Sequence, residues 1–434
     1  MRRSRTEGSK RRRCVATALA FGIVALALGC AGPGRAETQL APFESFSSAK
    51  LQRVGDLIRQ EIAAGKMPGA IILIQQHGHP VYFECFGVRD LESRHPMTPD
   101  SIFRIYSMSK PITSVAAMML VEDGKLALED PVGKYIPAFA DVKVGIEKMD
   151  ENGKSVLVLE PLARPITIKD LLRHTSGLTY GFYGDTLVRK LYTNSGLFED
   201  DPDNAAFAER IAKLPLAEQP ATRWDYGHST DVLGHVIEVI SGQTLYEFEK
   251  QRLLDPLGMS ETAFFVADPA LRLRIAQPVP DDPFDRPLAG IKDPTVPRRW
   301  ESGGAGMVAT IGDYARFAQM LLNGGTLEGR RYLKPETIAL MVSDHIGPET
   351  KIVLDQFYFP GATSGFGLGF AVRTSVPANT SWPLGEYRWD GVAGTFFFID
   401  PRDDMFAILL IQAPSQAGRI QLPLKTLIYD ALGK

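Results

Sequence analysis

Segments with the character of β-strands lie near both ends of this chain, and segments with helical periodicity lie between them. At the N-terminal end, two β-rich runs around a turn at Gly78 predict a hairpin. Near the C-terminal end, residues 366–373, 395–399 and 405–411 predict strands. The economical arrangement is an α/β (α+β) fold, in which an antiparallel sheet built from both chain ends is flanked by helices. A mostly helical region, about residues 105–325, is then inserted between the two parts of the sheet.

Helical periodicity and turn signals organise most of the remaining chain. Residues 141–166 predict a small hairpin with Asn152-Gly153 as its turn. Thr167 and Asp170 have the spacing of a capping box that begins a short helix. Residues 266–300, rich in Pro and Asp, predict an irregular surface stretch. Longer apolar repeats predict helices at residues 51–64, 107–121, 203–214, 231–240, 245–254, 310–322 and 423–432.

The helix predicted for residues 107–121 is apolar almost all round, so we expect it to be central and buried. It begins with Ser107-x-x-Lys110, and side chains three residues apart share one face of a helix. A serine hydroxyl needs a base within hydrogen-bond reach to act as a nucleophile. A buried lysine loses its proton more easily and can serve as that base. Ser107 is therefore a candidate nucleophile and Lys110 its candidate base.

The same four-residue pattern is expected about once or twice by chance in a chain of this length. A second match, Ser47-x-x-Lys50, precedes an amphipathic surface helix, where a helix cap is the better interpretation. Catalysis by such a pair also needs a group that passes the proton to the leaving group. Tyr226, in a loop before the helix at 231–240, could do this if Lys110 and another cation lowered the pKa of its phenol. A loop tyrosine taken alone is more often structural.

The first 36 residues predict an export signal rather than part of the fold. Residues 1–13 carry seven basic side chains and one acidic side chain, and a short apolar run follows, too short for a comfortable membrane span. Two processing routes remain open: cleavage after Ala36, which is slightly preferred, or a lipoprotein signal to residue 29 that leaves a lipidated Cys30. We expect an exported protein, periplasmic or secreted, whose only membrane attachment would be a lipid at Cys30.

Charge and cysteine content limit the kinds of partner and cross-link that the protein can have. Without residues 1–36 the net charge changes from −3 to −10, which argues against a nucleic-acid partner. Cys85 is the sole cysteine after Ala36, so no disulfide can form within the mature chain. His77 and His79 are better explained as part of a hairpin turn than as a pair of metal ligands. We expect a small-molecule ester or amide substrate, with no metal and no cofactor, and the sequence leaves the oligomeric state open.

Several motifs in a characteristic order resemble the serine β-lactamase and penicillin-binding protein superfamily, whose S-x-x-K carries the nucleophile. The resemblance covers about residues 50–430 and is greatest to the branch of class C β-lactamases, D-alanyl-D-alanine peptidases and family VIII carboxylesterases. It implies a β-lactamase/transpeptidase-like fold for one serine hydrolase domain, residues 37–434. The matching segments are Phe103–Lys110, Leu171–Leu178, Trp224–Tyr226, Asp231–Gly234, Asp255–Met259, Ser302–Gly306 and Asp313–Phe317.

The resemblance also implies roles for individual residues. Ser107 would attack a carbonyl and form an acyl-enzyme, with Lys110 and Tyr226 as the base system. The third family motif, often Lys-Thr-Gly, aligns with Trp389-Asp390-Gly391. An oxyanion hole would come from the backbone N–H groups of Ser107 and Val392, and one such donor typically contributes about 3 kcal/mol to the transition state.

Departures from the family pattern bear on the substrate. Trp389 replaces the lysine that helps to hold the carboxylate of a β-lactam, and family VIII esterases often carry Trp-Gly-Gly here. Asp390 would repel an anionic substrate further, and His228 stands where the Tyr-x-Asn pattern has its amide. We therefore predict a carboxylesterase acting on short acyl esters, with Trp389, Asp390, Gly391 and His228 binding the substrate. A class C-like β-lactamase or a D-alanyl-D-alanine carboxypeptidase or other D-amino-acid peptidase is the alternative, and a non-enzymatic envelope protein is a third.

Overall fold

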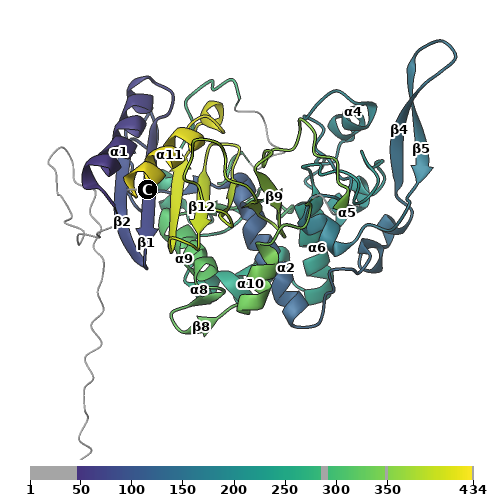
Figure 1. Cartoon of the computed structure of the whole chain (residues 1–434). Coiled ribbons are helices and arrows are strands. Elements are labelled where there is room, and N and C mark those ends of the chain that lie inside the picture. Colours follow the sequence, from purple (N-terminus) through teal and green to yellow (C-terminus); the bar gives the residue numbers. More distant parts are fainter. Residues whose placement is uncertain (1–45, 285–291, 348–349, 433–434) are drawn as a thin grey trace, which may run out of the picture.

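The structure, a computed structural model, describes residues 46–284, 292–347 and 350–432. The predicted export signal, including Cys30 and Ala36, lies outside the described residues. At the centre is a seven-stranded antiparallel sheet with the order β2-β1-β13-β12-β11-β10-β9 (Figure 1). Its strands are β1 (Gly69–Gln76), β2 (His79–Gly87), β9 (Ser364–Phe366), β10 (Ala371–Arg373), β11 (Tyr387–Asp390), β12 (Phe396–Asp400) and β13 (Met405–Ile411). The prediction of an α/β (α+β) fold with one sheet built from both chain ends is confirmed.

Both faces of the sheet are buried, and strand alternation divides its side chains between two cores. Ala407 and Leu409 of β13 face the core beneath α1 (Ser48–Ala63) and α11 (Gln421–Ala431), which lie side by side (Figure 1). Ile408 of the same strand faces the larger core formed with the helical region. Burial on both faces explains why β13 is apolar at every position instead of alternating with polar residues.

The helical region lies between β2 and β9 in the sequence and packs on the second face of the sheet. Its central element is α2 (Ser109–Glu122), which is buried at every position from Ser109 to Leu120. The other helices are α3 (Ile168–Leu172), α4 (Leu187–Thr193), α5 (Asn204–Ile211), α6 (Ser229–Ser241), α7 (Leu245–Glu249), α8 (Asp255–Leu257), α9 (Ile311–Leu322) and α10 (Pro335–Met341). Small two-stranded sheets pair β3 (Phe103–Arg104) with β6 (Val308–Ala309), β4 (Lys143–Met149) with β5 (Ser155–Pro161), and β7 (Thr326–Leu327) with β8 (Arg330–Arg331).

Several local predictions are confirmed. The hairpin expected at residues 141–166 is the β4–β5 pair, which projects from the body of the molecule (Figure 1). The capping box of Thr167 and Asp170 is present with both of its reciprocal hydrogen bonds. Ser47 caps α1 by accepting a hydrogen bond from the backbone of Lys50, so this second S-x-x-K match is a helix cap, as interpreted.

Other local predictions were wrong in detail. The α-helix expected from residue 107 begins only at Ser109, because Tyr106–Met108 form a 3₁₀ turn before it. The strand expected at residues 366–373 is split into β9 and β10 by a turn that contains Gly369, whose φ is +99°. The helix expected at residues 245–254 is present, but its residues 250–254 are π-helical and it continues through α8 to Leu257 instead of ending before Pro256.

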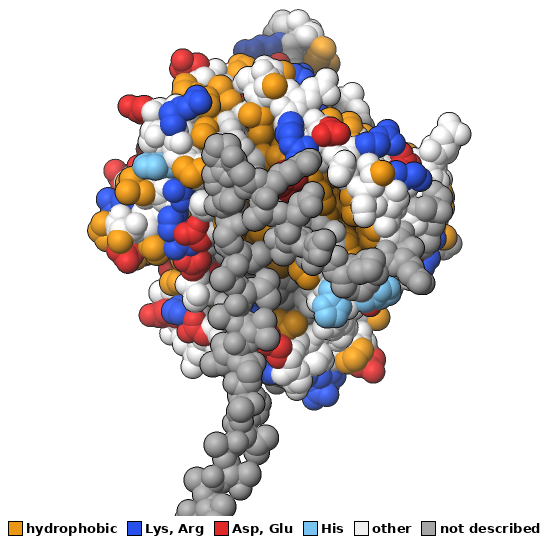
Figure 2. Space-filling model, turned by 90° about the vertical axis from the view of Figure 1, so that its left-hand side faces the viewer, with side chains coloured by type: hydrophobic (Ala, Val, Ile, Leu, Met, Phe, Trp, Pro, Cys, Tyr) orange, Lys and Arg blue, Asp and Glu red, His pale blue; other side chains and the backbone are white. Residues whose placement is uncertain are grey.

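On the face that carries α1 and β2, basic and acidic side chains are interspersed instead of gathered by sign (Figure 2). The hairpin turn between β1 and β2 contains His77, whose Nδ1 lies 2.9 Å from Oδ2 of Asp404. Within the described part of the chain, no helix combines the length and the apolar character needed to cross a membrane.

Candidate active site

Ser107 lies in a 3₁₀ turn, Tyr106–Met108, immediately before α2. Its neighbours on both sides are buried, whereas Ser107 itself is partly exposed. The positive φ of Tyr106 is a strained conformation for a residue with a side chain, and such strain costs on the order of 1–3 kcal/mol. The turn therefore presents one hydroxyl at the surface of a site and fixes its direction.

Lys110, on the first turn of α2, points back at Ser107. Its Nζ lies 3.2 Å from Oγ of Ser107, 2.7 Å from the carbonyl oxygen of Gly304 and 3.3 Å from the hydroxyl of Tyr180. Only 1% of this lysine is exposed, and burial lowers its pKa to about 7. A neutral amine can donate to Gly304 and Tyr180 while its lone pair accepts the proton of Ser107.

Tyr226 lies on the other side of Ser107, in the loop before α6, and its hydroxyl is hydrogen-bonded to Ser107. The indole N–H of Trp389 donates to the same phenol over 3.2 Å, and Nζ of Lys110 lies 4.5 Å from the centre of the ring. Burial raises the pKa of Tyr226 well above its usual value, and these hydrogen bonds lower it by less. The condition that Lys110 and another cation lower this pKa is not met, because desolvation dominates, so the phenol keeps its proton at neutral pH.

A buried carboxylate, that of Asp231 on α6, stabilises the base region. Asp231 lies 2.8 Å from Nδ1 of His228, and it accepts hydrogen bonds from Ser302 (2.6 Å) and from the backbone of Gly304 (3.1 Å). Burial alone would raise its pKa, but the hydrogen bond and charge of His228, with the charge of Lys110 and the Ser302 hydroxyl, lower it overall. Asp231 therefore stays ionised and holds Gly304, the residue whose carbonyl binds Lys110.

His228 was predicted to bind substrate, and the structure gives it a further contact. It is 6% exposed, its Nδ1 is occupied by Asp231, and its ring packs edge-on against Tyr180 at 4.5 Å between centroids. The predicted role in substrate binding remains a prediction, but this histidine clearly links the carboxylate to the aromatic lining of the site.

Trp389 and Asp390, adjacent on β11, point to opposite faces of the sheet. Trp389 pairs with Phe397 and faces the site, whereas Asp390 pairs with Phe396, which faces the core under α11. The Asp390 carboxylate lies beside Gln421 of α11, and burial raises its pKa. The expectation that Asp390 repels substrate directly was therefore wrong, because the alternation of the strand turns its side chain away from Ser107.

Gly391 allows β11 to approach the turn that carries Ser107. A Cβ at this position would lie 2.5 Å from the carbonyl oxygen of Ile105 and 2.2 Å from Oγ1 of Thr395, closer than atoms can pack. Val392 follows with its side chain 40% exposed. Its backbone N–H remains, with that of Ser107, the predicted oxyanion hole.

Sequence reasoning missed two aromatic residues that line the site. The side chain of His174 is 1% exposed and lies 4.9 Å from the ring of Tyr226, and burial with the nearby Lys110 lowers its pKa well below the usual value. Tyr180 is also buried, and burial raises its pKa well above the usual value. His174 stood in a motif that carried the resemblance, which was a usable signal, whereas nothing in the sequence marked Tyr180.

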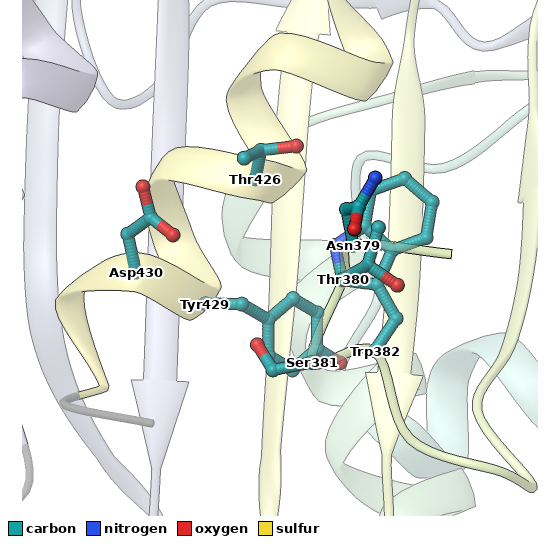
Figure 3. A pocket seen from close by; sticks show the side chains of 7 residues that line it. All are labelled: Asn379, Thr380, Ser381, Trp382, Thr426, Tyr429 and Asp430. Carbon is teal, nitrogen blue, oxygen red and sulfur yellow. The ribbon is translucent and has the colours of Figure 1, made fainter. Parts of the chain in front are cut away.

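Two cavities in the molecule do not contain Ser107. One, of about 370 Å³, is lined by Trp224 and by ionic side chains that include Arg189 and Arg223. Another, of about 270 Å³, lies between α11 and the loop that contains Trp382 (Figure 3). Among the described residues, no group of three or more His, Cys, Asp or Glu side chains is arranged to hold a metal ion.

Comparison with known proteins identifies the family. A family model described as Beta-lactamase matches residues 54–428, which is most of the chain. The protein belongs to the beta-lactamase family. This membership confirms the predicted resemblance and its β-lactamase/transpeptidase-like fold, and it makes the chain an enzyme of the serine hydrolase type.

Individual relatives include esterases. The chain is 31% identical over 374 residues to the lovastatin esterase of Penicillium rubens, covering 81% of this chain and 90% of that protein. It is 30% identical over 407 residues to esterase EstB of Burkholderia gladioli, covering 88% and 95%. A similar solved structure is EstCE1, described as a hydrolase with promiscuous acyltransferase activity. It has a TM-score of 0.72 and 26% identity, with 89% of this chain and 99% of that chain covered.

Proposed function

We propose that this protein is a carboxylesterase that forms an acyl-enzyme at Ser107 and acts on short acyl esters. The observation that carries the proposal is the contact between Ser107 and a buried Lys110, whose pKa is lowered to about 7. A lysine in bulk water is protonated at neutral pH and cannot accept the serine proton, whereas this one is poised to do so. The esterases among the relatives support the same reaction class.

The reaction would proceed in two halves. Oγ of Ser107 attacks the ester carbonyl and passes its proton to neutral Lys110, and the predicted oxyanion hole binds the oxygen that becomes negative. The neutral phenol of Tyr226 gives a proton to the departing alcohol oxygen and regains one from the protonated Lys110, which becomes neutral again. In the second half, water loses a proton to neutral Lys110 and attacks the acyl-enzyme. The bond to Oγ of Ser107 then breaks, the acid is released, and Lys110 returns the proton to Oγ.

The position of Trp389 favours an ester over a β-lactam. This side chain fills the place of the family's lysine and donates to Tyr226, so it offers a substrate carboxylate no positive charge. A penicillin, a cephalosporin or a peptide ending in D-alanine carries such a carboxylate and would lose that partner. A neutral small-molecule ester has no carboxylate, so the absence of a positive charge does not weaken its binding. We therefore rank a β-lactamase or D-alanyl-D-alanine carboxypeptidase second.

Turnover of three substrates tests the proposal. We expect p-nitrophenyl butyrate to be hydrolysed, nitrocefin and a D-Ala-D-Ala peptide to be turned over much more slowly, and Ser107→Ala to abolish ester hydrolysis. Activity that persists in Ser107→Ala would refute the acyl-enzyme at this residue. Faster turnover of nitrocefin than of the butyrate ester would refute the esterase assignment.

We also propose that the protein is exported, on the basis of the basic and then apolar pattern in its first 29 residues. Cell fractionation should place it in the periplasm or the medium. Mass spectrometry of the mature N-terminus should then begin after Ala36 or show a lipid on Cys30. An intact Met1 in the cytoplasmic fraction would contradict export.

A further inference from the structure

Two phenylalanines are exposed beside the candidate site. Phe182 is 48% exposed and Phe359 is 45% exposed, although large aromatic side chains are usually buried. The segment that carries Phe182 precedes α4, and the segment that carries Phe359 precedes β9. Two distant parts of the chain thus each place one exposed ring at the same location.

Ring contacts connect both phenylalanines to the groups around Ser107. Phe182 is stacked on Tyr180 at 5.0 Å between centroids, and the hydroxyl of Tyr180 contacts Lys110. Phe359 lies 5.8 Å from the ring of Tyr226. Tyr183 joins the two, at 4.6 Å from Phe182 and 4.9 Å from Phe359. The rings therefore form a continuous surface that begins at the catalytic tyrosine and extends outward.

The backbone around Phe359 is held on both sides. The preceding residue, Tyr358, is buried, and its hydroxyl donates to the carbonyl of Ser364 over 3.0 Å. The following carbonyl, that of Pro360, accepts a hydrogen bond of 2.9 Å from Arg388. An exposed ring between two such contacts has little freedom to collapse, so it is already placed for a ligand.

Phe182 is held in a similar way. The carbonyl of Gly181 accepts a hydrogen bond of 2.9 Å from the hydroxyl of Thr193 on α4. A Cβ on Gly181 would lie 2.4 Å from that hydroxyl oxygen, so this close approach requires glycine. The exposed ring that follows is fixed by its backbone as well as by stacking.

We propose that Phe182, Tyr183 and Phe359 form an aromatic wall that binds a flat, uncharged apolar group of the substrate ester. The proposal rests on the proposed function of Ser107. Aromatic faces recognise flat apolar groups by stacking and by removal of apolar surface from water. Lys110, the cationic residue type in contact with Ser107, is buried and acts as a neutral base, so it offers an anionic substrate no positive charge. The preferred substrates are then esters with an aryl group, in addition to a short acyl chain.

Kinetics on three esters test the wall. Ethyl acetate has no ring, whereas 2-naphthyl acetate and ethyl 2-naphthoate carry the same ring on the alcohol and acyl sides. We expect Phe359→Ala and Phe182→Ala to lower kcat/KM ten- to thirty-fold on at least one naphthyl ester, mainly through KM, and to leave ethyl acetate within twofold. Phe359→Trp should retain most of the activity. Leu422→Ala, which removes an exposed leucine from α11 across the sheet, serves as the control.

A binding measurement separates this proposal from the proposed function. In the Ser107→Ala background, binding of 2-naphthyl acetate and of ethyl 2-naphthoate is followed by quenching of the protein fluorescence. We expect Phe359→Ala to weaken the binding of at least one of the two at least fivefold. Unchanged binding of both, or equal losses on all three esters, would overturn the wall. Persistent turnover in Ser107→Ala would instead overturn the catalytic assignment, while the binding comparison would still decide on the wall.

Discussion

The indole Nε1 of Trp389 donates a hydrogen bond of 3.2 Å to the hydroxyl of Tyr226. The phenol oxygen thus accepts from tryptophan, and the same hydroxyl is hydrogen-bonded to Ser107. Trp389 is 7% exposed and lies one residue before the end of β11. The residue that replaces the family's lysine therefore holds the phenol of Tyr226 in position and is more than a substitute for a lost charge.

Trp389→Phe removes this donor and keeps an aromatic ring in the same packing position. We expect kcat on p-nitrophenyl butyrate to fall about tenfold, equivalent to roughly 1.4 kcal/mol, with KM within about twofold, because the hydrogen bond orients the phenol of Tyr226 and does not hold substrate. Steady-state kinetics with urea unfolding as a check on the fold would measure this. Trp382→Phe, beneath α11 on the other face of the sheet, should leave kcat unchanged. A change confined to KM would contradict the orienting role.

The pKa of Lys110, lowered to about 7, predicts the pH dependence of activity. Only the neutral amine accepts the serine proton, so kcat/KM for an uncharged ester should rise through about pH 7 and level off above it. Asp231 is the larger of the two negative charges that raise this pKa, and Asp390 is the smaller. Asp231→Asn should therefore shift the midpoint to lower pH.

Asp390→Asn is the matched control, because its carboxylate acts on Lys110 from across the sheet. We expect it to shift the midpoint in the same direction by a smaller amount. The full profiles, fitted between pH 5 and 9 for wild type and both variants, give the comparison. A midpoint that stays fixed or rises in Asp231→Asn would show that a group other than Lys110 controls the acidic limb.

The close approach of β11 to the turn that carries Ser107 predicts the effect of Gly391→Ala. The new Cβ would collide with the carbonyl of Ile105, two residues before Ser107. We expect kcat/KM to fall at least tenfold and the free energy of unfolding to fall by about 1–3 kcal/mol, the range typical of overpacking. Gly312→Ala in α9, with no atom nearer than 4.0 Å, should leave activity unchanged and stability equal or higher. Normal kinetics in Gly391→Ala would contradict the close approach.

Much of the architecture followed from local signals. The strands at both ends could be predicted because their apolar runs are bounded by turns, and a sheet is the way to bury them together. Ser107 and Lys110 could be paired because a spacing of three places them on one helical face. Because adjacent side chains of a strand point to opposite faces of the sheet, the sequence could also have shown that Asp390 and Trp389 face opposite sides. The wrong expectation for Asp390 came from treating the three-residue motif as one unit and not as part of a strand.

Other features of the site depend on contacts that the sequence does not contain. The direction of the pKa shift of Tyr226 is decided by the extent of its burial, which arises from packing between separate segments. Tyr180 meets Lys110 across 70 residues of chain. Tyr106 has a positive φ at the start of the 3₁₀ turn that precedes α2, and no composition rule predicts such a conformation for tyrosine.

A buried acid behind α2 shows how far this burial extends. Glu249 is fully buried; its Oε1 accepts a hydrogen bond of 2.8 Å from Thr113, and its Oε2 has no hydrogen-bond partner. Burial raises the pKa of Glu249 well above its usual value. The carboxyl of Glu249 therefore binds its proton more tightly in the folded state than in the unfolded state. Its contribution to the free energy of unfolding is present below the pKa of the unfolded state. It is lost as the pH rises from that pKa through the pKa of the folded state.

Glu249→Gln keeps the shape of the side chain and removes the ionisation. We expect wild type and variant to have similar unfolding free energies near pH 4.5, whereas the variant should be the more stable at pH 8. The gain should be up to about 1.4 kcal/mol for each pH unit between the two pKa values. Urea unfolding at the two pH values measures the difference, with Glu336→Gln on exposed α10 as a control that should change by less than about 0.5 kcal/mol. A variant less stable than wild type at pH 8 would mean that Glu249 is ionised and paired in the folded protein.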